Sequence, residues 1–445
     1  MDIKKRAKEL QPDVVKDLTS LVSYYSVFNE GEEGTPFGVA NRDCLKKALE
    51  IAEGYGFRTK NCDVYCGYAE IGEGDEIIGI LAHLDVVPCS DTWATDPTVL
   101  TYKDGKYYGR GATDDKGAGV CAMHAMRIIK ETGVPLNKRI RLIWGCNEEN
   151  GSNGIKHYIE SGEEVVSCGF TPDGYFPVIY GEKGICSGTF SGKSEKILDI
   201  KGGTVSNAVA AKCEFTLAEN SYDTGLLKEF LDSENVKFTI EGNKLTVFGV
   251  AAHAMSPELG VNAISYGLEA LYKAGIDDVF VTAYHDKIGL TYNGEKLGVD
   301  FVDEYSNLTY NVGLAYMADG NVTTTFDIRF PVTKACDEIT EPLLKNGEGY
   351  IKIKSTHVPL FFDPEGPMIK SLLDAYYKVK GNRDDKPLVI GGGTYAKVMP
   401  NIVAFGCEDM NVDSHIHDDN EFASAESLLF QTETYAEAIL NLLKI

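Results

Sequence analysis

The pattern of apolar and polar positions predicts helices at the start of the chain and buried strands after them. Apolar residues recur at helical spacing from about 3 to 25 and from 41 to 55, which is typical of amphipathic outer helices. A nearly continuous apolar run follows at 77–84, which is typical of a strand that is covered on both faces. The segment 138–146 is interpreted as another buried strand and 168–171 as a short one. Together these segments predict an α/β catalytic domain whose central mixed sheet is flanked by helices.

Each of these three predicted strands ends in residues that can bind a metal or move a proton. His83 and Asp85 end the first run, Glu148 and Glu149 follow the second, and Asp173 follows the third. The H-x-D spacing places the first two on one side of an extended chain, so the Asp85 carboxylate can hydrogen-bond a ring nitrogen of His83. A lone H-x-D or E-E pair is weak evidence, because surfaces carry many. Three strand ends that carry them together predict one site at the carboxyl edge of the sheet.

A glycine-rich turn at 109–117 holds two adjacent carboxylates, Asp114 and Asp115, directly before a helical pattern at 118–130. A short hairpin, whose turn is Asp104-Gly105, precedes it. One of the two carboxylates could serve only as a helix N-cap. Two consecutive carboxylates with three glycines exceed what a cap requires, so we expect Asp114 to belong to the same site as the strand ends.

The pattern of apolar and polar residues changes after about residue 184. From there, strand-like segments alternate with helical ones, and few strands end in acidic residues. This stretch predicts an α+β lid domain at 185–382, inserted into a catalytic domain made of 1–184 and 383–445. Within the insert, His253 stands between a strand and a helix. It is a candidate to reach across to the site, and a structural role for it is about equally compatible with the pattern.

Two further candidates lie in the last part of the chain. The run Gly391-Gly392-Gly393-Thr394 precedes a helical segment, and its backbone amides could cradle a carboxylate, although a flexible turn is the commoner use. The stretch 413–421 is rich in acidic residues and holds His415 and His417. A helix at about 423–444 closes the chain.

Composition narrows the class of protein. The 43 basic and 67 acidic residues give a formal charge of −24, which disfavours nucleic acid and anionic membrane surfaces as partners. The 11 cysteines are an odd number without a C-x-x-C pair, as expected for reduced thiols. No stretch approaches the roughly 20 apolar residues of a membrane span, and the N-terminus is not signal-like. We therefore expect a cytoplasmic protein.

Taken together, these motifs resemble the dinuclear metallohydrolases that include acetylornithine deacetylase, succinyl-diaminopimelate desuccinylase, aminoacylase and bacterial dipeptidases. The resemblance covers nearly the whole chain, and five motifs occur in the family's order. Within the family the chain is most similar to the PepV-type dipeptidases, because of the length of the insert and two motifs, His83-Leu84-Asp85-Val86-Val87-Pro88 and Gly391-Gly392-Gly393-Thr394-Tyr395.

The resemblance implies two divalent metal ions. His83 and Asp173 would bind one, Glu149 and His417 the other, and Asp114 would bridge them through a turn with a cis peptide between Asp114 and Asp115. His417, four residues before Glu421, matches the family's H-x-x-x-E ending better than His415. Ligands of this kind favour zinc and are compatible with manganese or cobalt.

The resemblance also implies the catalytic and substrate-binding roles. Glu148 would be the general base, supported by Asp85, and His253 would stabilise the oxyanion. Asn207 and Arg329 would contact the substrate. The amides of Gly392 and Gly393, with Thr394, stay candidates for binding substrate from the glycine run alone. Arg329 could pair with the C-terminal carboxylate of a substrate or form only a surface salt bridge.

The predicted function is a metal-dependent dipeptidase that acts on small peptides. An N-acyl amino acid deacylase or desuccinylase needs the same metal core and is the alternative enzyme. A catalytically silent peptide- or metal-binding protein is the alternative of another class, although the intact Glu148 and the complete ligand set argue against it. Because the insert is long, we expect a monomer.

Overall fold

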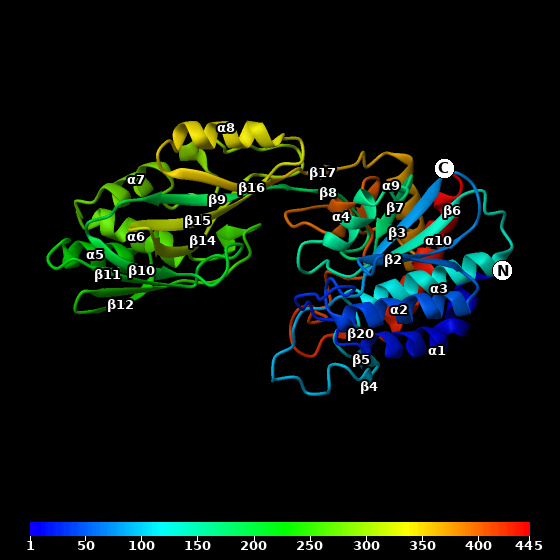
Figure 1. The fold of residues 1–445 in the computed structure, drawn as a ribbon. Helices are drawn as coiled ribbons and strands as arrows, with labels where there is room; N and C mark the ends of the chain where they lie inside the picture. The colour runs from blue at the N-terminus through cyan, green and yellow to red at the C-terminus, as the bar shows by residue number, and fades with distance from the viewer. The chain divides into compact units, whose positions relative to one another are not determined.

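The computed structural model describes residues 1–445, and the chain divides into two compact units. The first unit consists of Met1–Tyr180, Phe362–Leu388 and Gly393–Ile445, and the second of Gly181–Phe361 and Val389–Gly392. The second unit is therefore an insertion into the first (Figure 1). None of the helices is long and apolar enough to span a membrane.

The first unit alternates helices with mostly short strands. Its helices are α1 (Ile3–Val22), α2 (Val39–Gly54), α3 (Lys116–Thr132), α4 (Asn153–Glu160), the 3₁₀ helix η3 (Tyr395–Val398), α9 (Pro367–Lys380) and α10 (Ala425–Leu442). Its strands are β1 (Arg58–Cys62), β2 (Cys66–Ile71), β3 (Ile77–His83), β4 (Thr101–Lys103), β5 (Lys106–Tyr108), β6 (Arg139–Gly145), β7 (Cys168–Thr171), β19 (Ile402–Ala404) and β20 (Phe422–Ser424). Strand β8 (Ile179–Glu182) contains the boundary between the units.

The central sheet of the first unit is mixed, in the order β1-β2-β6-β3-β7-β19-β8. Strands β6, β3, β7 and β19 run parallel, and β1, β2 and β8 pair antiparallel with their neighbours. All seven residues of β3 are buried, because this strand is central and covered on both faces. The predicted α/β fold with a central mixed sheet is confirmed.

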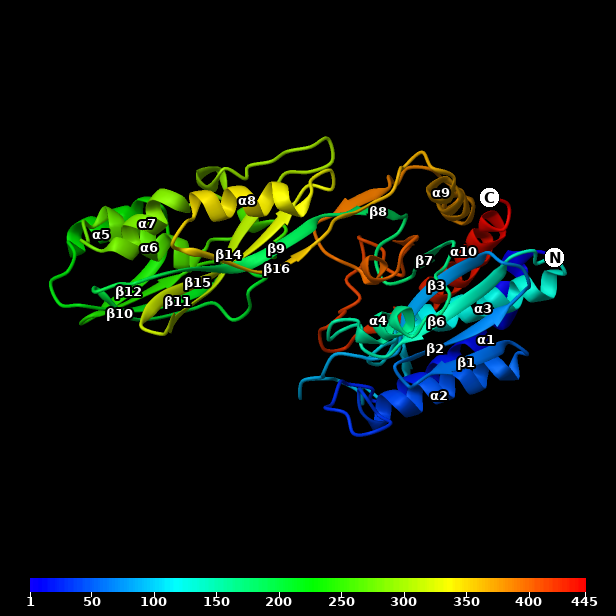
Figure 2. The ribbon, with the colours of Figure 1, turned by 45° about the horizontal axis from the view of Figure 1, so that its top comes forward.

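Helices cover this sheet and bring distant parts of the chain together. Helix α3 packs on β3 and β6, α2 packs on β1 and β2, and α1, α3 and α10 pack against one another. The contact between α1 and α10 brings the two ends of the chain to the same end of the unit (Figures 1 and 2). A separate small sheet, β20-β5-β4, joins the C-terminal segment to the predicted hairpin.

The second unit is an α+β structure. Its helices are α5 (Thr224–Ser233), α6 (Ala263–Lys273), α7 (Val279–Lys287), α8 (Cys336–Asn346) and the 3₁₀ helices η1 (Pro257–Leu259) and η2 (Glu295–Leu297). Its sheet is antiparallel, in the order β12-β13-β11-β10-β14-β15-β9-β16. The helices lie on one face of this sheet (Figure 2).

The strands of that sheet include the two longest of the fold, β14 and β15, which form a hairpin. Their bounds are β9 (Gly184–Gly192), β10 (Ile197–Gly202), β11 (Lys212–Leu217), β12 (Lys237–Glu241), β13 (Lys244–Phe248), β14 (Thr309–Ala318), β15 (Asn321–Phe330) and β16 (Ile351–His357). The short strands β17 (Leu360–Phe361) and β18 (Leu388–Ile390) both pair with β8.

The observed boundaries of the insertion differ from the expected 185–382. The chain returns to the first unit at Phe362, because α9 buries Ile369, Leu372 and Ala375 and packs on α10. The short stretch Val389–Gly392 belongs to the second unit instead of the first. The terms catalytic domain and lid remain predictions about what the two units do.

Candidate metal centre

The topology of the first unit brings the three predicted strand ends to one edge. Strand β3 lies between β6 and β7, and all three run parallel. Their carboxyl ends therefore meet, and the residues that follow them approach one another. His83 is the last residue of β3 and is buried. Glu148 and Glu149 follow β6, and Asp173 follows β7.

The His83 ring is oriented by two contacts. Its Nδ1 lies 3.0 Å from the main-chain oxygen of Asp85. Because a carbonyl oxygen only accepts, Nδ1 carries the proton of this hydrogen bond. Its other ring nitrogen, Nε2, lies 3.1 Å from Oδ1 of Asp114 and is the ring atom that faces the cluster. Metal-binding histidines typically show this arrangement, in which the far nitrogen donates to an oxygen.

The Asp85 carboxylate has a different role from the expected hydrogen bond to the ring. Its Oδ1 lies 3.6 Å from Nδ1 of His83, too far for that bond. Instead, Oδ1 and Oδ2 each accept a main-chain N–H at 3.0 Å, from Glu148 and from Glu149. The ring contact is therefore made by the main-chain oxygen of Asp85 and not by its carboxylate. Asp85 thus positions both glutamates.

The turn before α3 places Asp114 opposite two histidines. Oδ1 of Asp114 lies 3.1 Å from Nε2 of His83, and Oδ2 lies 2.9 Å from Nε2 of His417. The peptide between Asp114 and Asp115 is cis, as the resemblance implied. The Asp115 carboxylate accepts the main-chain N–H of His83 at 3.0 Å, so it ties the turn to the end of β3.

The same turn needs two of its glycines. Gly111 has φ of +84°, in the left-handed region that favours glycine. A Cβ on Gly117 would lie 1.9 Å from the main-chain oxygen of Ala112, so no side chain fits where α3 begins. The glycines predicted to allow close backbone approach therefore have that function here.

Glu421 fixes the main chain of the turn, a role that the sequence does not predict. In the sequence it serves only to identify His417 through the H-x-x-x-E spacing. It is buried, and its Oε1 accepts the main-chain N–H of Thr113 at 2.8 Å and of Asp114 at 3.0 Å. Its Oε2 accepts the N–H of Gly111 and a guanidinium N–H of Arg110, both at 2.9 Å. The one signal in the sequence is Arg110 in the glycine-rich turn, because a buried arginine needs an acidic partner. The sequence does not show which acidic residue that is.

His417 completes the cluster from the C-terminal segment. Its Nε2 lies 3.1 Å from Oε1 of Glu149, besides its contact with Asp114. His415 points elsewhere, since its ring lies 6.2 Å from the ring of Phe422. The open choice between the two histidines is therefore answered by geometry in favour of His417 as the one at the cluster.

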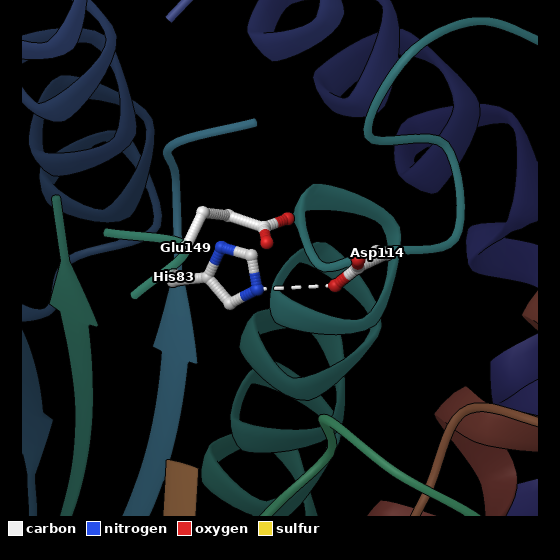
Figure 3. Close-up of side chains that lie close together, drawn as sticks. All are labelled: His83, Asp114 and Glu149. Carbon is white, nitrogen blue, oxygen red and sulfur yellow. Dashed lines mark hydrogen bonds and ion pairs between the residues drawn. The ribbon is translucent and has the colours of Figure 1, made fainter. Parts of the chain in front are cut away.

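Two groups of side chains have ligand atoms that lie within 4.8 Å of one another. One is His83, Asp114 and Glu149, and the other is His83, Glu148 and Asp173. Figure 3 shows the first group, with His83 at the end of its strand and Asp114 at the start of α3. Imidazole and carboxylate ligands at this spacing fit divalent metal ions, and each oxygen of the Asp114 carboxylate faces one of the two histidines.

The charges of the cluster shift its pKa values. Although burial lowers the pKa of His83, the Asp114 carboxylate raises it well above its usual range. Hydrogen bonds to Asp114 and Glu149 raise the pKa of His417 to about 10. Burial and the charge of Asp173 raise the pKa of Glu148 to about 8. Without metal, the raised pKa values of both histidines favour protonated rings beside these carboxylates.

The candidates in the second unit lie near one another. The main-chain oxygen of Asn207 accepts the N–H of Ala254, next to His253, and Arg329 lowers the pKa of His253 in addition to the larger effect of burial. Arg329 is buried, so its ion pair with Asp327 is not on the surface. Both Nε and Nη2 donate to that carboxylate, and Nη1 donates to the main-chain oxygen of Gly391 at 3.1 Å.

The glycine run is divided between the units. Gly392 belongs to the second unit and Gly393 to the first. Thr394 caps η3 by accepting the N–H of Ala396 with its side chain. The predicted roles of these three residues and of Asn207 in binding substrate remain predictions.

A family model described as Peptidase family M20/M25/M40 matches residues 79–441. The chain belongs to this peptidase family. The match contains every strand end of the cluster and His417, so the family assignment and the geometry concern the same part of the chain. The resemblance stated from the motifs is thereby confirmed.

Relatives in this peptidase family match along almost their whole length. "Putative dipeptidase YtjP" of Bacillus subtilis is 34% identical over 97% of this chain and 97% of its own. The structure of human carnosine dipeptidase 1 has a TM-score of 0.60 at 17% identity, over 100% of this chain and 98% of that one.

A further structure is the YXEP protein of Bacillus subtilis, named as a dinuclear metal binding peptidase of the M20 family. It has a TM-score of 0.51 at 13% identity, over 98% of this chain and 99% of that one. At these identities the two structures show that the fold is shared.

Replacing Glu421 tests how the turn is held. In Glu421→Gln an amide NH₂ replaces one carboxylate oxygen. It cannot accept the hydrogen bonds that main-chain N–H groups donate to that oxygen, so Asp114 loses its fixed position. We expect divalent-metal affinity to fall by about 10- to 100-fold, measured by calorimetric titration with Zn²⁺ and Mn²⁺. The exposed Glu30→Gln is the matched control and should bind as the unchanged protein does. Equal affinities for all three proteins would refute the positioning role.

The histidine pKa values make metal binding depend on pH. Because the metal-free histidines hold protons at pH 7 and a ligand must lose its proton to bind a cation, binding should release protons. The pKa values are raised, so proton competition weakens as pH rises, and apparent affinity should increase from pH 6 to pH 8. Calorimetry at pH 7 in two buffers of different ionisation enthalpy measures the release. A proton count of zero would contradict the shifted pKa values.

Proposed function

We propose that this chain is a metal-dependent dipeptidase of the M20/M25/M40 family. The observation that carries the proposal is the Asp114 carboxylate, whose two oxygens face Nε2 of His83 and Nε2 of His417 at 3.1 and 2.9 Å. The names of the relatives, dipeptidases in two cases and a dinuclear metal binding peptidase in the third, support the same reading.

The ligand set divides into two halves that share Asp114. We propose that His83 and Asp173 hold one ion and that His417 and Glu149 hold the other. Zinc is our first choice because it is commonly bound by imidazole and carboxylate, and manganese and cobalt are the alternatives. Divalent ions bound in this way can lower the pKa of water from 15.7 to roughly 7 and polarise a carbonyl group.

Glu148 is the proposed general base. Its carboxyl lies in the same group as His83 and Asp173, and its main-chain N–H is held by Asp85 at 3.0 Å. A carboxylate with a raised pKa can take a proton from the attacking water and deliver it to the leaving amine. Asp85 supports this step by positioning the main chain of both Glu148 and Glu149.

The second unit supplies the remaining proposed contacts. His253 would donate to the oxyanion of the transition state, and Arg329 would bind the C-terminal carboxylate with the guanidinium donors that Asp327 and Gly391 leave over. Asn207, and the amides of the glycine run with Thr394, would complete the contacts to substrate.

We further propose that the protein is a cytoplasmic monomer. All 11 cysteines are free and most are buried, which fits a reducing compartment. Light scattering on the purified protein measures the mass in solution, and a stable dimer would overturn the second part of this proposal.

Glu148→Ala tests the role of the general base. We expect dipeptide hydrolysis to fall by about 100- to 10,000-fold, while elemental analysis shows that the metal content is retained. The control is Glu160→Ala, an exposed glutamate in α4, which should leave hydrolysis unchanged. Retained activity in a metal-quantified sample of Glu148→Ala would remove Glu148 as the base.

The same assay distinguishes the alternatives. An N-acyl amino acid deacylase would cleave N-acetyl or N-succinyl amino acids faster than free dipeptides. A metal-loaded protein that cleaves none of these substrates would instead support a silent binding protein.

A further inference from the structure

A cavity of about 350 Å³ lies in the first unit beside the metal cluster. Two of its lining residues, Thr113 and Phe422, are the chain neighbours of Asp114 and Glu421. This volume falls within the roughly 300 to 1,000 Å³ of small-molecule sites. Its apolar wall is formed by Phe176, Tyr376, Met410, Val412, Phe422 and Phe430.

The aromatic part of the wall is built from rings that contact one another. The ring centroid of Phe176 lies 5.3 Å from that of Tyr376 and 5.4 Å from that of Phe430. Packed aromatic rings of this kind hold a fixed shape. The cavity is therefore suited to an apolar group of substrate size.

Glu408 also lines the cavity, and its main chain is fixed close to the cluster. Its N–H donates to the main-chain oxygen of Gly174 at 3.0 Å, and its own oxygen accepts the N–H of Phe176 at 3.0 Å. Gly174 directly follows Asp173, so the main chain of this cavity-lining residue lies next to one strand end of the metal centre.

The Glu408 carboxylate makes no hydrogen bond or ion pair within the chain. Burial and the nearby charges of Asp114 and Asp173 raise its pKa to about 8. A half-buried carboxylate without a partner is costly, and a cation from outside the chain would relieve that cost. The cluster carboxylates already serve the proposed metal ions, whereas Glu408 is not among their ligands.

We propose that Glu408 and this cavity form the subsite for the N-terminal residue of the dipeptide. The carboxylate pairs with the α-ammonium group, and the aromatic wall receives an apolar side chain. This inference rests on the proposed dipeptidase function and names its preferred substrates: dipeptides with a free amine and a large apolar first residue.

The charge of the cavity determines which end of the peptide it accepts. Besides Glu408, the lining includes Asp409 and Glu426, whereas Lys380 and Asp385 pair with each other and add no net charge. This excess of negative charge repels the C-terminal carboxylate of a dipeptide and attracts its ammonium group. The N-terminal residue is therefore the one that binds on this side.

The test compares leucyl-glycine with 4-methylpentanoyl-glycine, which has the same carbon skeleton but lacks the amine. We expect Glu408→Gln to lower kcat/KM for leucyl-glycine by about 10- to 100-fold, because the variant loses a hydrogen bond between two charged groups and such bonds contribute affinity of that order. The amine-free compound, measured as a substrate or as a competitive inhibitor, should change by less than about twofold. Glu160→Gln, an exposed glutamate in α4, is the matched control.

A second variant tests the cavity itself. Val412 is 51% exposed, so Val412→Trp narrows the cavity without disturbing a packed core. It should reduce kcat/KM for leucyl-glycine while glycyl-glycine, which has no side chain to place, is cleaved as before. Equal loss for both peptides, or none for either, would overturn the cavity as the side-chain subsite.

The outcomes separate the two levels of the proposal. If the unchanged protein cleaves leucyl-glycine and Glu408→Gln affects both compounds equally or neither, the subsite is wrong and the dipeptidase function stands. If the unchanged, metal-loaded protein cleaves no dipeptide, the proposed function itself fails, and the subsite fails with it.

Discussion

The candidate centre depends on how one carboxylate is held between two imidazole rings. Asp114 is buried, and a buried carboxylate is destabilising unless positive charge or hydrogen bonds compensate it. The chain provides both, because His83 and His417 face its two oxygens and Glu421 fixes the main chain of the turn on the other side. Protons on the two histidines can therefore compensate the charge of the Asp114 carboxylate, and divalent cations that replace those protons can do the same.

Much of this site could be predicted from sequence because it lies at strand ends. Predicted strands that are followed by His83, Glu148 and Asp173 mark the carboxyl edge of a parallel sheet, and the order β6-β3-β7 brings those ends together. The glycines of the turn could be predicted for the same reason, since close backbone approach leaves a direct trace in the sequence. The central mixed sheet follows from the same pattern of buried strands.

Other features depend on tertiary contacts that no local pattern records. The return of the chain at Phe362 follows from the packing of α9 on α10, and Pro367–Lys380 alone does not show which unit it joins. The ring of His83 donates to the main-chain oxygen of Asp85 at 3.0 Å, whereas the Asp85 carboxylate lies 3.6 Å away, and the H-x-D pattern does not distinguish the two. Glu421 and Glu408 lie in an acidic C-terminal stretch where neither stands out, and only folding shows that one supports the turn and the other faces a cavity.

The most direct test of the account is the number of ions that Asp114 controls. Elemental analysis after dialysis against zinc and removal of free metal should find two ions per chain in the unchanged protein. In Asp114→Asn the shared ligand loses its charge, so both halves weaken, and we expect less than one ion per chain together with the loss of dipeptide hydrolysis. Two tightly bound ions and full activity in that variant would contradict the bridging role of Asp114.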